Sequence, residues 1–216
     1  MRTEAAPLQG APAGPAKPLR RRGRILRAFG FLCLMAAFGV GGYLAWLLWG
    51  TGLATQRYQT EFRQEFIPRL QQVKPPPAVE PAHLPGDVLA ELVIPRIDID
   101  IFVVEGTDTV DLQKGPGHYS QTAYPWQDHG RVGIAGHRTT YLHPFWSLDK
   151  MRPGDPITLK TEYGTYKYDV RRVLVIPSAG SGWVLQQTKG PTLVLTTCNP
   201  RYSATGRLIV FADRVN

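Results

Sequence analysis

A long segment without charge limits what this chain can fold into more than any other feature. Residues 28–56 contain no Asp, Glu, Lys or Arg, and the apolar centre runs from Phe29 to Gly50. As a helix, about 22 residues span roughly the 30 Å hydrocarbon core of a bilayer. A cleaved signal peptide has a shorter apolar region and a small-residue cleavage site, which residues 50–54 match only weakly. The sequence therefore predicts a transmembrane signal anchor over residues 28–50, rather than a cleaved leader or a buried helix of a soluble protein.

Basic residues crowd the chain just before this segment and predict its orientation. The net charge is +8, and five arginines lie within residues 20–27. The positive-inside rule places that end in the cytoplasm and the carboxyl-terminal part outside the cell membrane, with a single pass. Residues 1–19 are rich in Ala, Pro and Gly, so residues 1–27 are predicted to form a disordered basic tail. The cluster has no interleaved aromatic residues and no nucleic-acid motif, which argues against nucleic acid as a partner.

Residues 51–86 are predicted to link the anchor to a folded domain. Tyr58, Phe62, Phe66 and Leu70 recur every four residues, which indicates one apolar face of a helix. Pro68 is expected to interrupt or end that helix. The prolines that follow, at 75–77, 81 and 85, predict a semi-rigid extended spacer.

Residues 87–216 carry the pattern of an all-β domain. Short β-branched and apolar runs are separated by frequent Gly and Pro turns, with little helical periodicity. About eight strands are expected, and an antiparallel barrel or sandwich accommodates them. The clearest predicted strands cover residues 88–94, 97–104, 131–136, 157–161, 165–176, 193–197 and 207–215.

One cysteine lies where a predicted strand gives way to a loop. The apolar run from Thr192 to Thr197 leads into Cys198, and Pro200 cannot continue a central strand. The only other cysteine, Cys33, lies in the apolar anchor, so Cys198 has no partner for a disulfide within the domain. An unpaired cysteine in an exported domain marks a candidate reactive thiol, although a buried apolar thiol is the alternative interpretation.

A histidine and an arginine at strand ends complete a candidate catalytic set. His137 follows the small residues at the end of a predicted strand, and Arg207 opens the last strand. Taken singly, His137 suits polar surface and Arg207 suits a solvated cation. Together with Cys198 they suit acyl transfer, in which a thiolate attacks a carbonyl, an imidazolium protonates the leaving amine and a guanidinium stabilises the oxyanion.

These residues resemble the sortases, the membrane-anchored cysteine transpeptidases of Gram-positive bacteria. The resemblance is carried by Thr196-Thr197-Cys198 after an apolar strand, by Gly136-His137-Arg138 upstream and by Arg207 at the start of the last strand. Residues 112–119 and 136–141 are most similar to class E, and next to class D. The resemblance covers roughly residues 86–216 and implies an eight-stranded β-barrel with short helices, preceded by one N-terminal transmembrane helix.

The resemblance also implies a reaction and its partners. A surface protein with a C-terminal sorting signal of the LPxTG or LAxTG type is cleaved between Thr and Gly through a thioacyl-enzyme. The amine of a cell-wall precursor or of a pilin lysine then resolves the intermediate. The implied localisation is the cell membrane, with the catalytic domain extracytoplasmic.

The resemblance assigns His137, Cys198 and Arg207 as catalytic. Arg207 is preferred to Arg201, which also lies close to Cys198, because Arg207 precedes the final strand. The residues expected to bind substrate are His118, Tyr141, Thr196 and Thr197. No cofactor is expected. No metal is expected either, because the loop around Asp108 and Asp111 has no dense acidic cluster.

Three other functions compete with this assignment. A cysteine hydrolase or protease would use the same residues with water in place of the amine. A membrane-tethered β-barrel that binds cell-wall polymer would need no reactive thiol. An L,D-transpeptidase also uses Cys and His, but its usual His-Gly-Cys neighbourhood does not occur in this sequence.

Overall fold

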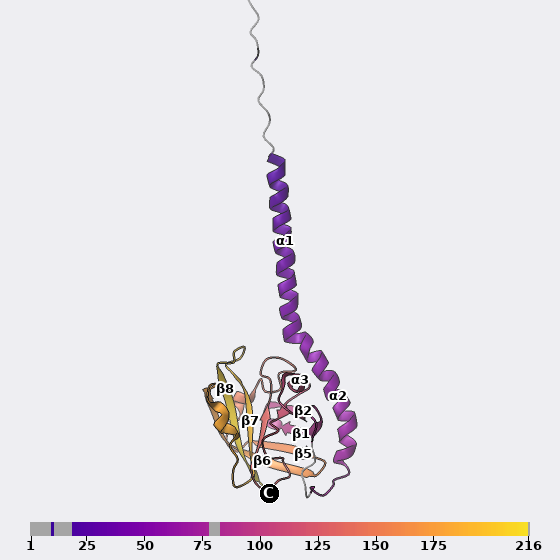
Figure 1. Ribbon diagram of the computed structural model, residues 1–216, viewed down its shortest axis with the longest axis vertical. Coiled ribbons are helices and arrows are strands. Elements are labelled where there is room, and N and C mark those ends of the chain that lie inside the picture. The colour runs from indigo at the N-terminus through magenta and orange to yellow at the C-terminus, as the bar shows by residue number, and fades with distance from the viewer. Residues whose placement is uncertain (1–9, 11–18, 78–82, 216) are drawn as a thin grey trace, which may run out of the picture. The chain divides into compact units, whose positions relative to one another are not determined.

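The structure is a computed structural model that describes residue 10 and residues 19–77 and 83–215 (Figure 1). Most of the predicted N-terminal tail and the predicted spacer proline at position 81 lie outside the described residues. The chain divides into two compact units, residues 1–43 and 44–216, which are described separately.

One long helix dominates the first unit. Helix α1 (Leu19–Ala45) begins directly before the basic cluster, nine residues before the predicted anchor, because Arg and Leu are good helix formers. Its segment Gly23–Ala45 is long and apolar enough to cross a membrane, with a mean hydropathy of 1.8. A π-helical turn, η1 (Trp46–Gly50), and helix α2 (Thr51–Leu70) follow. Helix α2 contains Pro68 and ends only at Leu70, two residues beyond it.

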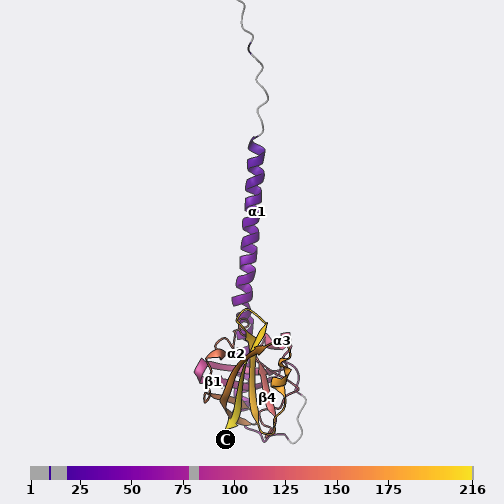
Figure 2. The same ribbon diagram turned by 90° about the vertical axis from the view of Figure 1, so that its left-hand side faces the viewer.

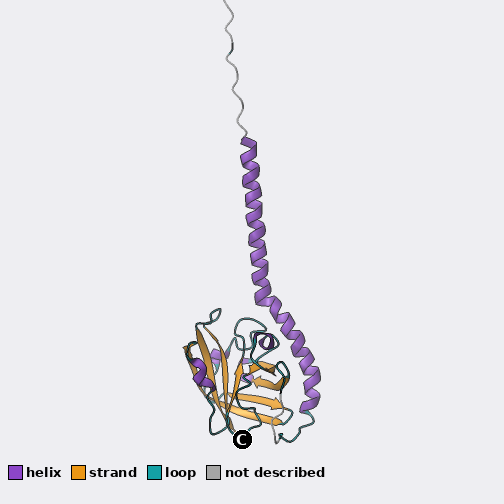
Figure 3. Cartoon of the chain, in the orientation of Figure 1, coloured by secondary structure: helices purple, strands orange, loops and turns teal. Residues whose placement is uncertain are grey.

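Eight strands close into a barrel in the order β1-β2-β3-β4-β7-β8-β6-β5 (Figures 1 and 3). The predicted eight-stranded barrel is therefore confirmed. The strands are β1 (Val88–Ile94), β2 (Ile99–Glu105), β3 (Gly117–His118), β4 (Arg131–Ala135), β5 (Pro156–Thr161), β6 (Gly164–Pro177), β7 (Thr192–Asn199) and β8 (Gly206–Val215). The connections carry the short helices η2 (Pro95–Ile97), α3 (Thr109–Leu112), η3 (Leu148–Lys150) and η4 (Ser181–Leu185).

The expectation of an antiparallel barrel is wrong for two strand pairs. β2 and β3 are parallel, and so are β4 and β7. Parallel strands need a crossover connection, and β5 and β6 lie in the chain between β4 and β7. The crossover returns the chain beside β4 in the same direction, so the carboxyl ends of β4 and β7 lie together.

Alternation along the strands separates the barrel core from an outer apolar cluster. Leu193 and Leu195 of β7 pack in the core, whereas Val194 packs in the outer cluster. The outer cluster also contains Ile209 and Phe211 of β8 and is completed by residues of η4. Figure 2 shows the side of the barrel on which β7 and β8 lie.

Helix α2 packs against the barrel on the side of β1, β2 and β5, away from β7 and β8 (Figures 1 and 2). Phe66 is buried and meets Phe102 of β2 edge to face, with ring centroids 6.0 Å apart. The Gln59 side chain accepts a hydrogen bond from the Phe102 N–H at 2.7 Å and donates to the Phe102 and Lys114 carbonyls. The apolar stripe predicted for α2 therefore supplies only part of the helix face that packs on the barrel, and polar side chains such as Gln59 supply the rest.

Candidate active site

The ends of β4 and β7 bring two of the predicted catalytic residues to the same level. The last paired residues of these parallel strands are Ala135 and Thr196. Two residues further along the chain, His137 lies beyond the end of β4 and Cys198 lies near the end of β7. The Gly136 N–H still bonds to the Thr196 carbonyl at 3.0 Å beyond the last pair. The parallel alignment therefore carries His137 to the level of Cys198.

Arg207 lies directly opposite Cys198 in the antiparallel pair of β7 and β8. Directly opposed residues project from the same face of a sheet. Cys198 alternates in phase with Val194, and Arg207 with Ile209, and both of these apolar residues belong to the outer cluster. The thiol and the guanidinium therefore project from the outer face of the barrel, where a substrate can reach them.

A glycine fixes the turn that presents His137. A Cβ built on Gly136 would lie 2.5 Å from Cδ2 of Phe145, a side chain that is fully buried. The Phe145 N–H in turn donates to the His137 carbonyl at 3.1 Å. Only glycine lets the core ring approach this closely, so the small residues before His137 have a packing role.

The His137 ring is mostly enclosed and faces Tyr141. The two ring centroids are 4.9 Å apart, with an angle of 37° between the planes. Nε2 is buried and has no hydrogen-bond partner among the described residues. Burial lowers the pKa of His137, because it disfavours the charged imidazolium. At neutral pH the resting ring is therefore held neutral, which suits a base that takes the proton of a neighbouring thiol.

The two arginines near Cys198 have different partners. Arg201 donates to the Trp146 carbonyl at 3.0 Å, pairs with Asp149 at 3.0 Å and lies over the Trp146 ring. Arg207 donates from Nη1 to two backbone carbonyls of its own turn, at 3.0 Å each. Within the described part of the chain, no carboxylate pairs with Arg207. Its guanidinium keeps donors for an incoming anion, whereas that of Arg201 is committed to holding the loop after β7.

A third arginine contacts the cysteine backbone and was not predicted as a site residue. Arg138 is buried and donates from Nη1 to the Cys198 carbonyl at 3.3 Å. The same nitrogen bonds to Asn199 Oδ1, and Nη2 pairs with Asp149 at 3.0 Å. Its position directly after His137 was the available signal. In the sequence it stands only as the third residue of the Gly136-His137-Arg138 motif.

His118, one of the predicted substrate-binding residues, lies inside the barrel wall. Its side chain is fully buried. Nδ1 bonds to Glu105 Oε2 at 2.8 Å, and Nε2 lies 3.0 Å from the Ala123 carbonyl oxygen. Both ring nitrogens therefore face acceptors within the protein, and this surrounding favours a structural role.

The other three predicted substrate-binding residues lie next to the catalytic set. Thr196 is buried and its hydroxyl lies 3.0 Å from the Tyr119 hydroxyl. Thr197 is also buried and donates to the Gly136 carbonyl at 2.7 Å. Tyr141 is partly exposed beside His137. Contact with substrate stays a prediction for all three, and exposure favours Tyr141 among them.

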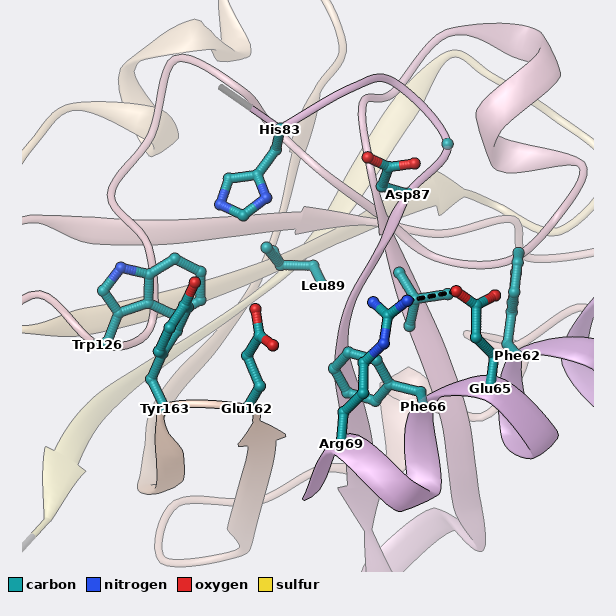
Figure 4. Close-up of a pocket in the computed structure, with 12 residues that line it drawn as sticks. Phe62, Glu65, Phe66, Arg69, His83, Asp87, Leu89, Trp126, Glu162 and Tyr163 are labelled. Atoms are coloured by element: carbon teal, nitrogen blue, oxygen red, sulfur yellow. Dashed lines mark hydrogen bonds and ion pairs between the residues drawn. The ribbon is translucent and has the colours of Figure 1, made fainter. Parts of the chain in front are cut away.

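A well-formed cavity of about 250 Å³ lies elsewhere, between α2 and the start of β1 (Figure 4). Phe62 and Phe66 line it on one side, and Trp126 and Tyr163 on the other. None of the predicted catalytic residues lines this cavity, so its size does not mark the reactive site. Among the described residues, no group of three His, Cys, Asp or Glu side chains is arranged to hold a metal ion.

Comparison with known proteins identifies relatives of this domain. Residues 92–215 match the family model described as the sortase domain. The chain is 34% identical to Sortase D of Bacillus subtilis over 134 residues, which are 60% of this chain and 65% of that protein. It is also 34% identical to Sortase SrtE1 of Streptomyces coelicolor over 145 residues, 61% of this chain and 41% of that protein. The matches thus span less than two thirds of the length of either relative.

Solved structures show the same barrel. A crystal structure of Sortase E1 from Streptomyces coelicolor with a tripeptide in the active site is 32% identical, with a TM-score of 0.57. The match covers 62% of this chain and 92% of that one. A Sortase D5 transpeptidase from Clostridium perfringens is 26% identical with a TM-score of 0.60, covering 76% of this chain and 99% of that one.

Proposed function

The chain belongs to the sortase family, and on this basis we propose that it is a membrane-anchored cysteine transpeptidase that acts on the sorting signals of surface proteins. One observation carries the proposal: His137 just beyond the end of β4 and Cys198 near the end of the parallel strand β7 lie at the same level, and Arg207 of β8 is paired with Cys198. These are the groups that acyl transfer from a peptide requires: a nucleophile, a base beside it and a donor for the oxyanion.

The first half of the reaction forms a thioester. His137 takes the proton of the Cys198 thiol, and the thiolate attacks the threonine carbonyl of an LPxTG or LAxTG signal. The N–H groups of Arg207 stabilise the oxyanion of the tetrahedral intermediate. The imidazolium then gives its proton to the departing glycine nitrogen as the Thr–Gly bond breaks.

The second half passes the acyl group to an amine. The amine of a cell-wall precursor or of a pilin lysine attacks the thioester carbonyl and loses a proton to His137. The new amide forms as the thiolate leaves, and the proton on His137 returns to the Cys198 sulfur. The surface protein is then attached through its threonine, and the enzyme is restored.

The predicted anchor gives this reaction its location. Segment Gly23–Ala45 has the length and hydropathy of a membrane span, and arginines precede and overlap its start. These features support a single-pass protein with a cytoplasmic N-terminus and an extracytoplasmic barrel.

The decisive experiment offers both signals and an amine to the full-length protein in detergent micelles. LAxTG and LPxTG peptides are incubated with and without triglycine, and products are identified by mass spectrometry. We expect cleavage between Thr and Gly with triglycine attached. Cys198→Ala should abolish it, while the matched control Cys33→Ala, in the predicted anchor, retains it.

The other outcomes separate the competing functions. Hydrolysis of the peptides without amine attachment would support the cysteine protease. No turnover, together with a Cys198 thiol that resists alkylation, would support a non-catalytic module that binds cell-wall polymer.

A further inference from the structure

The first turn of helix α2 meets the loop that follows His137. The Tyr141 N–H donates to the Thr51 hydroxyl oxygen at 3.4 Å. One residue further along each segment, a Cβ built on Gly52 would lie 3.5 Å from Cδ2 of Leu142, which is ordinary van der Waals spacing. Leu142 also lines a cavity of about 340 Å³ together with residues of α2, including Gln59. The helix and the loop therefore share a hydrogen bond, and the Leu142 side chain lies close to Gly52.

Helix α2 is fastened to the barrel independently of that loop. Thr55 is fully buried and its hydroxyl donates to the Gln113 carbonyl at 2.7 Å. Gln59 makes three hydrogen bonds with the backbone of Phe102 and Lys114. Below them, Phe66 packs on the Phe102 ring. Because these contacts hold the helix along most of its length, its first turn is a fixed surface for the loop.

The loop needs such a surface, because its backbone is strained. Tyr141, Leu142 and His143 have φ angles of 52°, 62° and 38°, in the left-handed region that non-glycine residues rarely adopt. Three successive residues persist there only when their surroundings hold them. The first of the three, Tyr141, is also the residue whose ring contacts His137.

We propose that helix α2 is a positioning element for His137: its first turn, through Thr51 and Gly52, holds the strained loop 141–143 so that the Tyr141 ring encloses the imidazole. This inference rests on the proposed function only in naming His137 as the catalytic base. It makes the segment that joins the predicted anchor to the barrel a working part of the active site rather than a spacer.

The inference predicts what happens to His137 when the loop is released. A looser Tyr141 exposes the imidazole to water, so the pKa of His137 rises from its lowered value toward the ordinary one. The titratable or charged groups on the neighbouring elements are Arg138 on the chain after β4, Cys198 on β7 and Arg207 on β8. Strand pairing and the Arg138–Cys198 hydrogen bond hold them without α2. A shift in the pKa of His137 therefore indicates a change in how the loop buries the imidazole and not a change in neighbouring charges.

The test uses the full-length protein in detergent micelles and the double variant Thr51→Val, Leu142→Ala. The matched control is Thr60→Val, because the Thr60 hydroxyl donates only within α2, to the Gln56 carbonyl, and is exposed. His137 is titrated by NMR, with its ring signals assigned by their loss in His137→Gln. Steady-state kinetics with the sorting peptide are measured in parallel.

We expect the double variant to raise the pKa of His137 and to lower kcat on the order of tenfold or more, since small displacements of a catalytic group are that costly. KM should change little, and Thr60→Val should match the wild type in both readouts. A folded double variant with an unchanged His137 titration would overturn the inference. If the double variant does not fold, the same His137 titration of the single Thr51→Val variant tests the inference, and an unchanged pKa would overturn it.

The titration also separates the two proposals. A wild-type protein that turns over neither peptide refutes the proposed function but leaves the titration readable. If the wild-type protein is active and the pKa of His137 is the same in the wild type and in the double variant, only the positioning role is refuted.

Discussion

Nη1 of Arg138 donates a hydrogen bond to the carbonyl oxygen of Cys198 at 3.3 Å, so the residue after the predicted base holds the backbone of the predicted nucleophile. The guanidinium also binds Asn199 and pairs with Asp149. Asp149 in turn pairs with Arg201 on the loop after β7. The chain after β4 and the chain after β7 are thus joined through one buried side chain, beyond the point where their strand pairing ends.

Arg138→Gln should loosen this junction. A glutamine cannot reach the Cys198 carbonyl, Asn199 and Asp149 together, so we expect a loss of about 1–3 kcal/mol of folding free energy and a fall in kcat. Thermal unfolding measures the first effect, and steady-state cleavage of the sorting peptide measures the second. Arg201→Gln is the control, since it removes the more exposed partner of the same carboxylate. Equal effects from both variants would contradict a special role for Arg138.

Arg207→Ala should reduce kcat/KM by a factor of roughly 10² to 10³, as expected when an oxyanion donor is removed. Arg207→Lys should not restore activity, because an ammonium lacks the planar fork of donors. Arg201→Lys should change turnover little, since Arg201 is engaged by Trp146 and Asp149. Peptide cleavage followed by chromatography checks all three. Wild-type turnover in Arg207→Lys would remove the proposed role.

The burial of His137 should make stability depend on pH. The pKa of His137 in the folded chain is lowered from the ordinary value of 6.5. Between the two pKa values, His137 is therefore protonated in the unfolded chain and neutral in the folded chain. This contribution to stability is present above about pH 6.5 and is lost as the pH falls toward the folded pKa. Thermal unfolding of the wild type and of His137→Gln, compared at about pH 7.5 and pH 5.5, should show a smaller decrease for the variant. Parallel decreases would contradict a buried neutral imidazole.

Glu105→Gln should destabilise the barrel by about 3–5 kcal/mol, because it removes the carboxylate from a buried pair. Burial alone would raise the pKa of Glu105, but the hydrogen bond and charge of His118 lower it below its ordinary value. Chemical denaturation measures the loss. The control is Asp128→Asn, which breaks the exposed pair with His129 and should have no measurable effect. A stable Glu105→Gln variant would show that the pair is dispensable.

The predicted orientation is testable on intact cells. A protease added outside should remove residues 57–216 and spare the N-terminal tail, detected with an epitope tag at each end. Lysed cells are the control, in which both tags should be accessible. Protection of the barrel in intact cells would reverse the orientation.

Sequence periodicity was enough to find most strands but not their partners. The predicted strand 88–94 coincides with β1. β3 lies outside the predicted strands, since two residues are too short for an alternating pattern. β7 extends through Cys198 to Asn199, because these residues still pair with Arg207 and Gly206 of β8. The parallel pairing of β4 with β7 depends on how the crossover folds, which no local pattern records.

The sequence was enough to predict those site residues whose chemical type alone suggests a role. It was not enough for residues whose role depends on their three-dimensional contacts. His137, Cys198 and Arg207 follow from reactivity at strand ends, and the structure brings them to adjacent ends. The roles of Arg138 and of the first turn of α2 depend on contacts between residues far apart in sequence. The resemblance placed His118 among the substrate-binding residues, whereas the structure buries its side chain inside the wall, paired with Glu105.

The closure of the barrel determines how an extended peptide can be held. At Arg207, β8 is paired on both sides, with Ile176 of β6 and with Cys198 of β7, so the wall offers a guest peptide no free strand edge at this point. In the proposed reaction, the amide groups of a sorting signal would then be met one at a time, by side chains and loop carbonyls at the rim of the outer face. Such recognition would depend on a few individually positioned side chains and loop groups more than on the regular backbone hydrogen bonds of an added strand. It would allow selectivity for a short motif within an otherwise variable sequence.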